Sequence, residues 1–270
     1  MSAHSGPRVR EPRDFSGTFP EVWERYMVPA VFVPWTRRLL DATGVRPGDR
    51  VLDVACATGT VARLAAQRLA GTGHVTGVDL DKAFLAVARK ASRDEGARID
   101  WHCGNASSLP FSPGSFDVVL CQQGIQFFDD RESAVREMHR VLDTRGRLGV
   151  SVFRSIDRSP GYGSLATALG RHLGPRAEAL TRRIFSLGDP EALRSLLQSA
   201  GFQRIDVRPD VGDVHFLSAE DFPHTYAAGW EAPPAATEAI IHEVVRDLRG
   251  YCDADGLTFP METLMATAQK

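Results

Sequence analysis

Regular alternation between short apolar strands and amphipathic helices constrains this chain more than any other feature of its sequence. The strand segments, such as Val51-Leu52-Asp53-Val54 and Val118-Val119-Leu120, are short and almost entirely apolar. Such runs are typical of parallel strands that are covered on both faces. The alternation therefore predicts an α/β fold with a doubly wound, mostly parallel sheet. The expected strands are 50–55, 74–79, 98–103, 116–122 and 147–153, and the expected helices are 60–69, 82–95 and 131–142.

The rest of the chain predicts a tail and helical caps around this sheet. Residues 19–44 carry apolar side chains at helical spacing, interrupted near Pro29 and Pro34, so we expect two short helices there. Two insertions interrupt the strand–helix rhythm, the first with a helix near 165–173 and the second with two helices around Pro233-Pro234. The expected division is a disordered tail at 1–18, an N-terminal helical cap at 19–44, and one domain at 45–270 with cap insertions at 154–188 and 218–250. A helix at 190–200, a strand from 204 and a closing strand at 258–268 complete that domain.

The composition argues against several classes of protein. Lys and Arg total 32 and Asp and Glu total 34, so the formal net charge is −2, and without a basic surplus we expect no nucleic-acid partner. No run of about 18 apolar residues is present, so we expect no membrane span, and the polar N-terminus lacks the apolar core of a secretory signal. The four cysteines lie far apart, and no two histidines have metal-ligand spacing on one helix face. We therefore expect a cytoplasmic protein without a metal.

A loop of small residues follows the first strand. The segment Val51–Ala62 runs from a strand through Ala55, Ala57 and Gly59 into a helix. Small side chains let a ligand approach the backbone, and the helix N-terminus offers free N–H donors. Asp79 ends the next strand, where a carboxylate can accept both hydroxyls of a ribose. Dinucleotide sites share both features, so on these residues alone an NAD-dependent oxidoreductase and other nucleoside-binding enzymes remain open.

A third feature, Gly104-Asn105-Ala106 after the third strand, has no dinucleotide counterpart. With it, the series VLDVACATG, GVD, GNASSLPF, SFDVVLCQQGIQFF and REMHRVLDTRGRL resembles the class I S-adenosylmethionine-dependent methyltransferases. The resemblance covers residues 45–153 and is similar to the small-molecule branch that includes the ubiquinone and menaquinone methyltransferases. It implies a Rossmann-like sheet of seven strands whose last strand is antiparallel. It also implies methyl transfer from S-adenosylmethionine to a small-molecule acceptor, such as a natural product or a quinone-like metabolite. The aromatic and aliphatic side chains of the cap segments predict that this acceptor is hydrophobic or aromatic.

The resemblance further implies a cofactor site at the strand ends. Its residues would be Asp53, Ala55, Thr58 and Gly59 around the methionine moiety, Asp79 on the ribose hydroxyls, Leu80 on the adenine face, Asn105 and Ala106 at the adenine edge, and Gln122 beside the methionyl amino group. The sequence departs from the family pattern at two places. Alanine stands at 55 and 57 where the family usually has glycine, and asparagine stands at 105 where aspartate is commoner. Asn105 can still accept and donate a hydrogen bond at the adenine edge.

The acceptor is expected after the fourth strand, beneath the caps. The expected substrate-binding residues are Gln123, Gln126 and Phe127, together with Tyr26 and Trp35 of the N-terminal cap, and the candidate proton acceptors are His224 and Tyr226. The only partner expected is the small-molecule acceptor, bound by a monomer or homodimer. Besides the oxidoreductase, two alternatives stay open: a cyclisation or rearrangement that uses the bound sulfonium without methyl transfer, and a cofactor-binding partner protein without catalysis.

Overall fold

The structure is a computed structural model that describes residues 14–270. The tail expected at 1–18 therefore lies mostly outside the described residues, and its described part, residues 14–18, has neither helix nor strand. This part contacts the first helix, because the backbone N–H of Asp14 donates to the hydroxyl of Tyr26 at 2.9 Å.

Among the described residues, seven strands form one continuous sheet in the order β3-β2-β1-β4-β5-β8-β6. Strands β1 to β5 are parallel, and β8 runs antiparallel to both of its neighbours, β5 and β6. The expected doubly wound sheet with an antiparallel last strand is thus confirmed, and a two-residue strand, β7, pairs with β8 outside this order. The strands are β1 Arg50–Val54, β2 His74–Asp79, β3 Asp100–Cys103, β4 Phe116–Gln122, β5 Leu142–Phe153, β6 Gln203–Phe216, β7 Cys252–Asp253 and β8 Gly256–Gln269.

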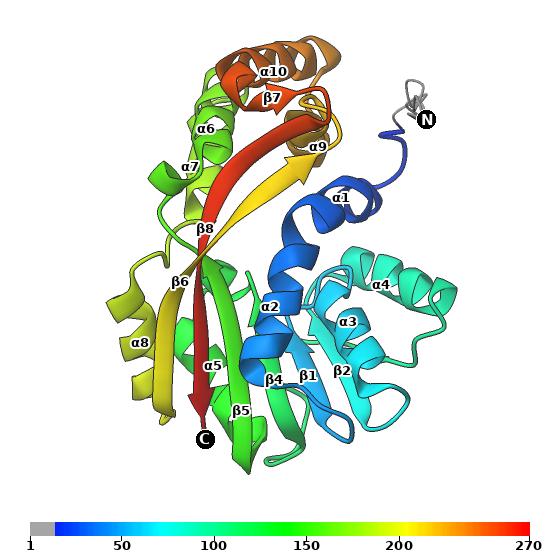
Figure 1. The fold of residues 1–270 in the computed structure, drawn as a ribbon, viewed down its shortest axis with the longest axis vertical. Coiled ribbons are helices and arrows are strands. Elements are labelled where there is room, and N and C mark those ends of the chain that lie inside the picture. The colour runs from blue at the N-terminus through cyan, green and yellow to red at the C-terminus, as the bar shows by residue number, and fades with distance from the viewer. Residues whose placement is uncertain (1–13) are drawn as a thin grey trace, which may run out of the picture.

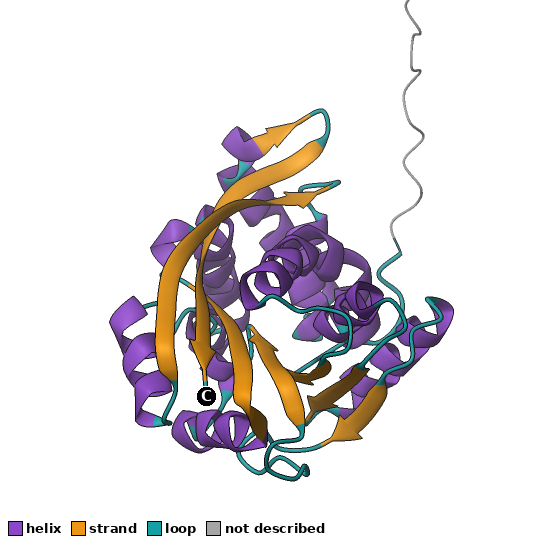
Figure 2. Cartoon of the chain, turned by 60° about the horizontal axis from the view of Figure 1, so that its bottom comes forward, coloured by secondary structure: helices purple, strands orange, loops and turns teal. Residues whose placement is uncertain are grey.

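Helices cover both faces of this sheet (Figure 2). In β4, Val118 and Leu120 belong to the core beneath α2 and α3, whereas Val119 and Cys121 belong to the core beneath α5 and α8. Because successive side chains of a strand point to opposite faces, a continuously apolar strand is stable only between two layers of helices. The helices of this part are α2 Val33–Thr43, α3 Thr60–Leu69, α4 Lys82–Asp94, α5 Arg131–Val141 and α8 Pro190–Ser199.

The ribbon formed by β6 and β8 continues beyond the sheet and supports a second layer of helices (Figure 1). A separate apolar core fills this layer, with Tyr162, Phe222 and Phe259 among its fully buried side chains. Helix α1 lies between the two layers in Figure 1 and contacts α9 above it and α4 below it. The helices are α1 Phe19–Met27, α6 Pro160–Leu173, α7 Pro175–Arg183, α9 Asp221–Gly229 and α10 Pro234–Asp247.

One expectation about the helical segments was wrong and two were confirmed. Segment 154–188 holds two helices where one was expected, because the chain turns at Gly174, with a φ of +94°, and Pro175 opens α7. The two short helices expected in 19–44 are present as α1 and α2, and the interruption near Pro29 is a π-helical turn, Val28–Phe32, that connects them directly. Pro29 and Pro34 each stand in the first turn of their own helical element, where a missing backbone N–H is tolerated. The two helices expected in 218–250 are present.

Candidate cofactor and acceptor site

A cavity of about 580 Å³ opens at the carboxyl ends of β1, β2 and β4. This is the edge of the sheet at which the strand order reverses, where open α/β sheets bind their ligands. Its floor comes from the loops after β1, β2, β3 and β4, and its roof from α1, α9 and the turn after α7. The residues expected at the site that line this cavity are Asp53, Ala55, Thr58, Asp79, Leu80, Asn105, Ala106, Gln122, Gln123, Phe127 and Tyr226.

The loop after β1 has an unusual backbone. Ala55, Ala57 and Gly59 have φ angles of +57°, +47° and +82°, a region that costs a residue with a Cβ about 1–2 kcal/mol. Backbone bonds hold the loop, since the Cys56 N–H donates to the Val78 carbonyl at 3.1 Å and the Gly59 N–H to the Cys56 carbonyl at 2.7 Å. The glycines that the family usually carries at 55 and 57 would adopt these angles without strain.

Asp53 is a buried carboxyl beneath this loop, with 1% of its surface exposed. One oxygen, Oδ2, accepts a hydrogen bond from the Ala62 N–H of α3 at 3.0 Å, and the other, Oδ1, has no partner among the described residues. Burial raises the pKa of Asp53 well above its usual value, and the nearby charge of Asp79 raises it further. A cationic group beside Oδ1 would offset the cost of ionising this carboxyl.

Asp79 faces the cavity from the end of β2. Its Oδ2 accepts from the Ala57 N–H at 2.8 Å, and its Oδ1 accepts from the Asp81 N–H at 2.8 Å. Burial raises the pKa of Asp79, although both backbone bonds favour the ionised form. Each carboxylate oxygen can accept a second hydrogen bond. Asp79 therefore both anchors the loop and keeps acceptor capacity for two ligand hydroxyls.

Asn105 lies exposed after β3, at the mouth of the cavity. Its Oδ1 accepts from the Ser107 N–H at 2.9 Å. The carbonyl oxygen that was expected to meet an adenine amino group thus already holds the local turn, and it has one lone pair left. The side-chain NH₂ is the donor that the turn does not use.

Replacement of Asn105 tests this arrangement. Asn105→Asp retains the acceptor for Ser107 and should leave the affinity for S-adenosylhomocysteine, measured by calorimetry, nearly unchanged. Asn105→Leu removes both the turn bond and the ligand contact and should weaken binding by ~1–2 kcal/mol. Equal affinities for the wild type and both variants would remove Asn105 from the site.

The three glutamines after β4 have different roles. Gln122 accepts from the Thr36 hydroxyl at 2.7 Å and donates to the Phe32 carbonyl at 3.2 Å, so its amide joins the N-terminal helices to the sheet. The Oε1 of Gln123 accepts from the Phe153 N–H at 2.8 Å and from the Gln126 amide at 2.9 Å. Gln126 is fully buried and does not line the cavity, so the structure places it beneath Gln123 and not at the cavity surface.

Several other expected residues lie elsewhere. Gly59, the last residue of the loop after β1, is buried against the ring of Trp101 and does not line the cavity. Trp35 is buried in the upper core, because α2 turns it toward β6 and β8. Tyr26 and His224 both stack on Phe15, at ring-centroid distances of 4.4 and 3.7 Å, outside the cavity. The structure thus places the expected substrate contacts Tyr26 and Trp35, and the expected proton acceptor His224, outside this cavity.

Tyr226 does line the cavity, but its environment does not suit a base. Its hydroxyl donates to the hydroxyl of buried Tyr162 at 2.9 Å. Burial raises the pKa of Tyr226 well above its usual value. The phenol therefore stays protonated at neutral pH and can act as a hydrogen-bonding group, not as a proton acceptor.

The other apolar side chains that line the cavity could be predicted from the sequence only in part. These side chains come from α1, the π-helical turn, α4, β5 and the turn after α7, and they are Phe19, Trp23, Phe32, Phe84, Phe153 and Ile184. Trp23 and Phe32 fall within the apolar spacing of the N-terminal cap, which was the available signal. Phe153 and Ile184 carry no local signal, because only the tertiary fold brings them to the cavity.

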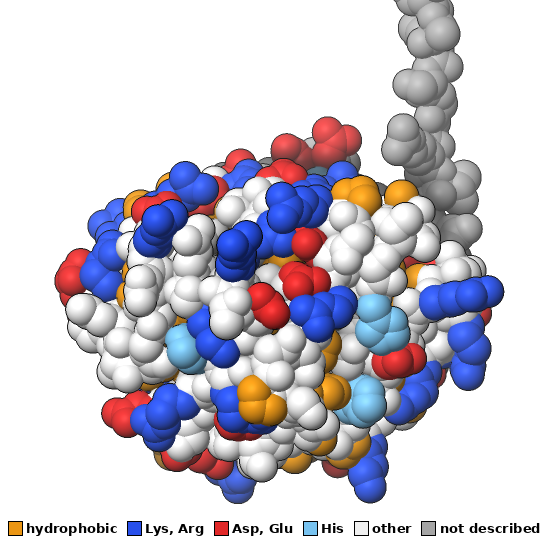
Figure 3. All heavy atoms as spheres, turned by 90° about the horizontal axis from the view of Figure 1, so that it is seen from below, with side chains coloured by type: hydrophobic (Ala, Val, Ile, Leu, Met, Phe, Trp, Pro, Cys, Tyr) orange, Lys and Arg blue, Asp and Glu red, His pale blue; other side chains and the backbone are white. Residues whose placement is uncertain are grey.

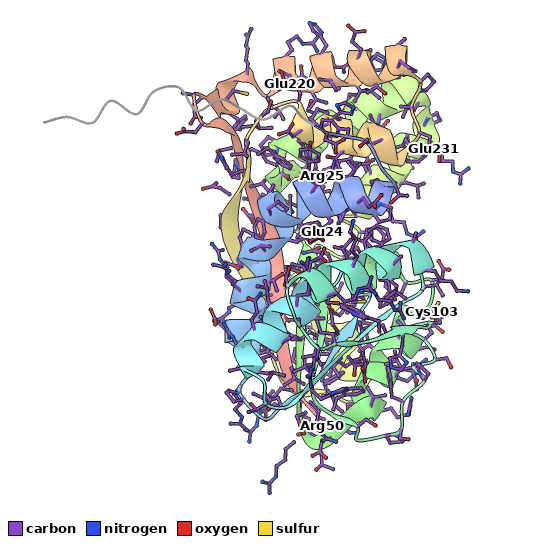
Figure 4. The ribbon with its side chains drawn as sticks, turned by 90° about the vertical axis from the view of Figure 1, so that its right-hand side faces the viewer. Glu24, Arg25, Arg50, Cys103, Glu220 and Glu231 are labelled. Carbon is purple, nitrogen blue, oxygen red and sulfur yellow. The ribbon has the colours of Figure 1, made fainter. Side chains whose placement is uncertain are left out.

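Helix α1 is tied to the floor by a buried cation. Arg63 of α3 pairs with Glu24 of α1 at 2.5 Å and also with Glu95 after α4. Figure 4 places Glu24 on the side of α1 that faces α3 and α4, while Arg25 lies on the opposite side. The side chain of Arg63 is 9% exposed and that of Glu24 is 23% exposed, so this pair is largely shielded from solvent. The contact holds the aromatic roof over the loop after β1.

Comparison with known proteins identifies the family. A model described as a methyltransferase domain matches residues 51–146. A ubiquinone/menaquinone biosynthesis C-methyltransferase of Chromobacterium violaceum is 32% identical over 189 residues, which cover 67% of this chain and 78% of the relative. The chain belongs to the class I S-adenosylmethionine-dependent methyltransferases.

Two further proteins, one compared by sequence and one by structure, are also similar to this methyltransferase. A 2-phytyl-1,4-naphthoquinone methyltransferase of Thermosynechococcus vestitus is 32% identical over 189 residues, covering 67% of this chain and 84% of the relative. Among solved structures, a [4+2]-cyclase is 26% identical with a TM-score of 0.56, covering 88% of this chain and 80% of the cyclase. The fold class and the enzymatic nature expected from the sequence are thus confirmed.

S-adenosylmethionine is the cofactor of this methyltransferase, and the residues present fit it. The unpartnered Oδ1 of Asp53 suits an ammonium group, and the free acceptor capacity of Asp79 suits ribose hydroxyls. Leu80, 70% exposed at the mouth, offers an apolar surface of the kind that an adenine ring covers. Within residues 14–270, no group of three or more His, Cys, Asp or Glu side chains could hold a metal ion, and no helix is long and apolar enough to cross a membrane.

Proposed function

We propose that this enzyme methylates a small oxygenated aromatic acceptor of the quinol type. The observation that carries the proposal is that the expected cofactor residues and the apolar roof line one and the same cavity. Its floor presents the carboxyls of Asp53 and Asp79, and its roof is built from rings such as Trp23, Phe32 and Phe153. A largely apolar pocket of this kind suits a flat aromatic molecule. The names of both relatives support the same class, since one refers to ubiquinone and menaquinone biosynthesis and the other to a naphthoquinone.

The roles of the residues follow from what they can do. The cofactor supplies an activated sulfonium methyl, so the protein chiefly has to align the acceptor and exclude water. We infer that Asp53, Ala55, Thr58, Asp79, Leu80, Asn105 and Ala106 hold the cofactor. Gln123 and Phe127 would contact the acceptor, and Gln122 would hold the roof in place. Tyr226, which stays protonated, would orient an acceptor oxygen or close the pocket.

Turnover of a defined acceptor tests the proposal. With S-adenosylmethionine and a reduced 1,4-naphthoquinone bearing a short prenyl chain, we expect S-adenosylhomocysteine to form together with a product that has gained one methyl group, detected by mass spectrometry. Gln123→Glu keeps the oxygen that accepts from Phe153 and Gln126 but replaces the amide donor by a charge. It should lower turnover about tenfold or more and leave S-adenosylhomocysteine binding intact. Absence of methylated product with any quinol or phenol would refute the acceptor class.

A second candidate function has one observation in its favour. The [4+2]-cyclase likeness covers most of both chains, and the apolar roof would equally enclose a molecule that folds on itself. The two functions differ in stoichiometry, because methylation releases one S-adenosylhomocysteine per product and a cyclisation releases none. Product formation with the cofactor fully recovered would favour the cyclase.

We also infer a cytoplasmic protein, monomeric or homodimeric, without a nucleic-acid partner. The near-neutral net charge supports the last point, as does the face shown in Figure 3, where Lys and Arg alternate with Asp and Glu and no single-sign field forms.

A further inference from the structure

Trp101 is a partly buried residue of β3 whose ring reaches the cofactor loop. It pairs in register with Gly77 of β2, and its indole N–H donates to the buried Ser92 hydroxyl of α4 at 3.3 Å. Neither Trp101 nor Ser92 belongs to the motifs that carry the family resemblance, and neither lines the cavity. The indole instead lies behind the cavity wall.

The ring of Trp101 lies against two glycines, Gly77 and Gly59. A Cβ placed on Gly77 would lie only 2.5 Å from Cε3 of Trp101, and a Cβ on Gly59 would lie 3.0 Å from Cζ3 and closer still to Cη2. Real side chains do not approach so closely, so the indole packs directly on the backbone of both residues. Gly77 precedes Asp79 by two residues, and Gly59 ends the loop that begins at Ala55.

The loop needs such support because its conformation is strained. Two of its positive φ angles belong to alanines, and strained backbone persists only where the surroundings hold it in place. On the cavity side the loop is held by Asp79, which accepts from Ala57. On the opposite side the indole fills the space into which the loop would relax.

We propose that Trp101 is a positioning residue for S-adenosylmethionine: its indole supports the loop 55–59 from behind and so fixes the backbone and Asp79 that face the cofactor. The inference rests on the cofactor placement of the proposed function. Loss of the ring lets the strained loop relax, and the binding geometry is lost without removal of any group that touches the ligand.

A double-mutant cycle on Gly77 and Trp101 tests this, with the affinity for S-adenosylhomocysteine measured by calorimetry. Gly77→Ala places a methyl group against the ring and should weaken binding about tenfold, and Trp101→Ala should weaken it by a similar factor. Because the collision with the ring disappears and only the milder contact with Cys56 Sγ at 3.2 Å is left, Gly77→Ala in the Trp101→Ala background should cost no more than about twofold. If Trp101→Ala does not fold, Trp101→Leu takes its place in the cycle.

The matched control is Leu197→Ala, which removes a fully buried side chain of α8 on the other face of the sheet. It should lower the melting temperature as Trp101→Ala does and leave S-adenosylhomocysteine affinity within about twofold of the wild type. Independent, multiplying effects of Gly77→Ala and Trp101→Ala would overturn the inference, as would wild-type affinity in Trp101→Ala. A wild-type protein that binds no S-adenosylhomocysteine would instead refute the cofactor placement itself.

Discussion

Replacement of Asp79 by alanine is expected to weaken S-adenosylhomocysteine binding by ~2–4 kcal/mol, because hydrogen bonds from two ribose hydroxyls to a charged acceptor are lost. The same change removes the acceptors for the Ala57 and Asp81 N–H groups, so the loop after β1 loses an anchor as well. Calorimetry with S-adenosylhomocysteine measures the loss.

Asp100→Ala is the matched control for this experiment. Asp100 is an exposed carboxylate at the start of β3, the opposite end of the sheet from the cavity, where it pairs with His74 at 3.0 Å. The control should bind like the wild type. Unchanged affinity in Asp79→Ala would show that the ribose is bound elsewhere, even though the family assignment stands.

Asp53→Asn is expected to raise the stability of the ligand-free protein and to weaken cofactor binding. Asparagine keeps an oxygen that can accept from the Ala62 N–H and removes a buried charge. Without ligand, the variant should be more stable than the wild type at neutral pH, because burial raises the pKa of Asp53 and so opposes ionisation of this carboxyl in the folded state. With ligand, it should bind S-adenosylhomocysteine more weakly by ~1.5–3 kcal/mol, because the ammonium group loses its charged acceptor.

The pH dependence of this effect has a definite sign. Burial raises the pKa of Asp53 in the folded state, so between the unfolded value near 4 and the raised value the folded state binds more protons. The wild type without ligand should therefore lose stability as the pH rises through this window, and Asp53→Asn should remove that component. Thermal melts across the acid to neutral range measure it.

Asp117→Asn provides the opposite case. The hydrogen bonds from Arg50 lower the pKa of Asp117, so its contribution is present above the unfolded value and is lost as the pH falls. This variant should be less stable than the wild type at neutral pH.

A destabilised Asp53→Asn variant with the wild-type pH profile would contradict the assignment of Asp53.

Hydrogen-bond partners were the least predictable part of the site. Gln122, Gln123 and Gln126 follow one another within five residues, and sequence reasoning placed the first beside the cofactor and the others at the acceptor. In the fold, Gln122 bonds Thr36 and Phe32, which are 86 and 90 residues away, and Gln126 is sealed beneath Gln123. An amide can donate and accept equally well at either kind of site, so its position in the chain does not select its partner.

The sequence by itself determined the order of the elements and the floor of the site. Apolar strand runs followed by polar residues are local signals, and parallel strands end at one edge of the sheet, so Asp53 and Asp79 had to meet there. Only the tertiary structure decided which side chains complete the roof beneath the expected caps and which residue supports the loop from behind. Phe153, Ile184 and Trp101 reach the site through packing between distant segments, and such contacts depend on how side chains fill space together, which no local pattern records.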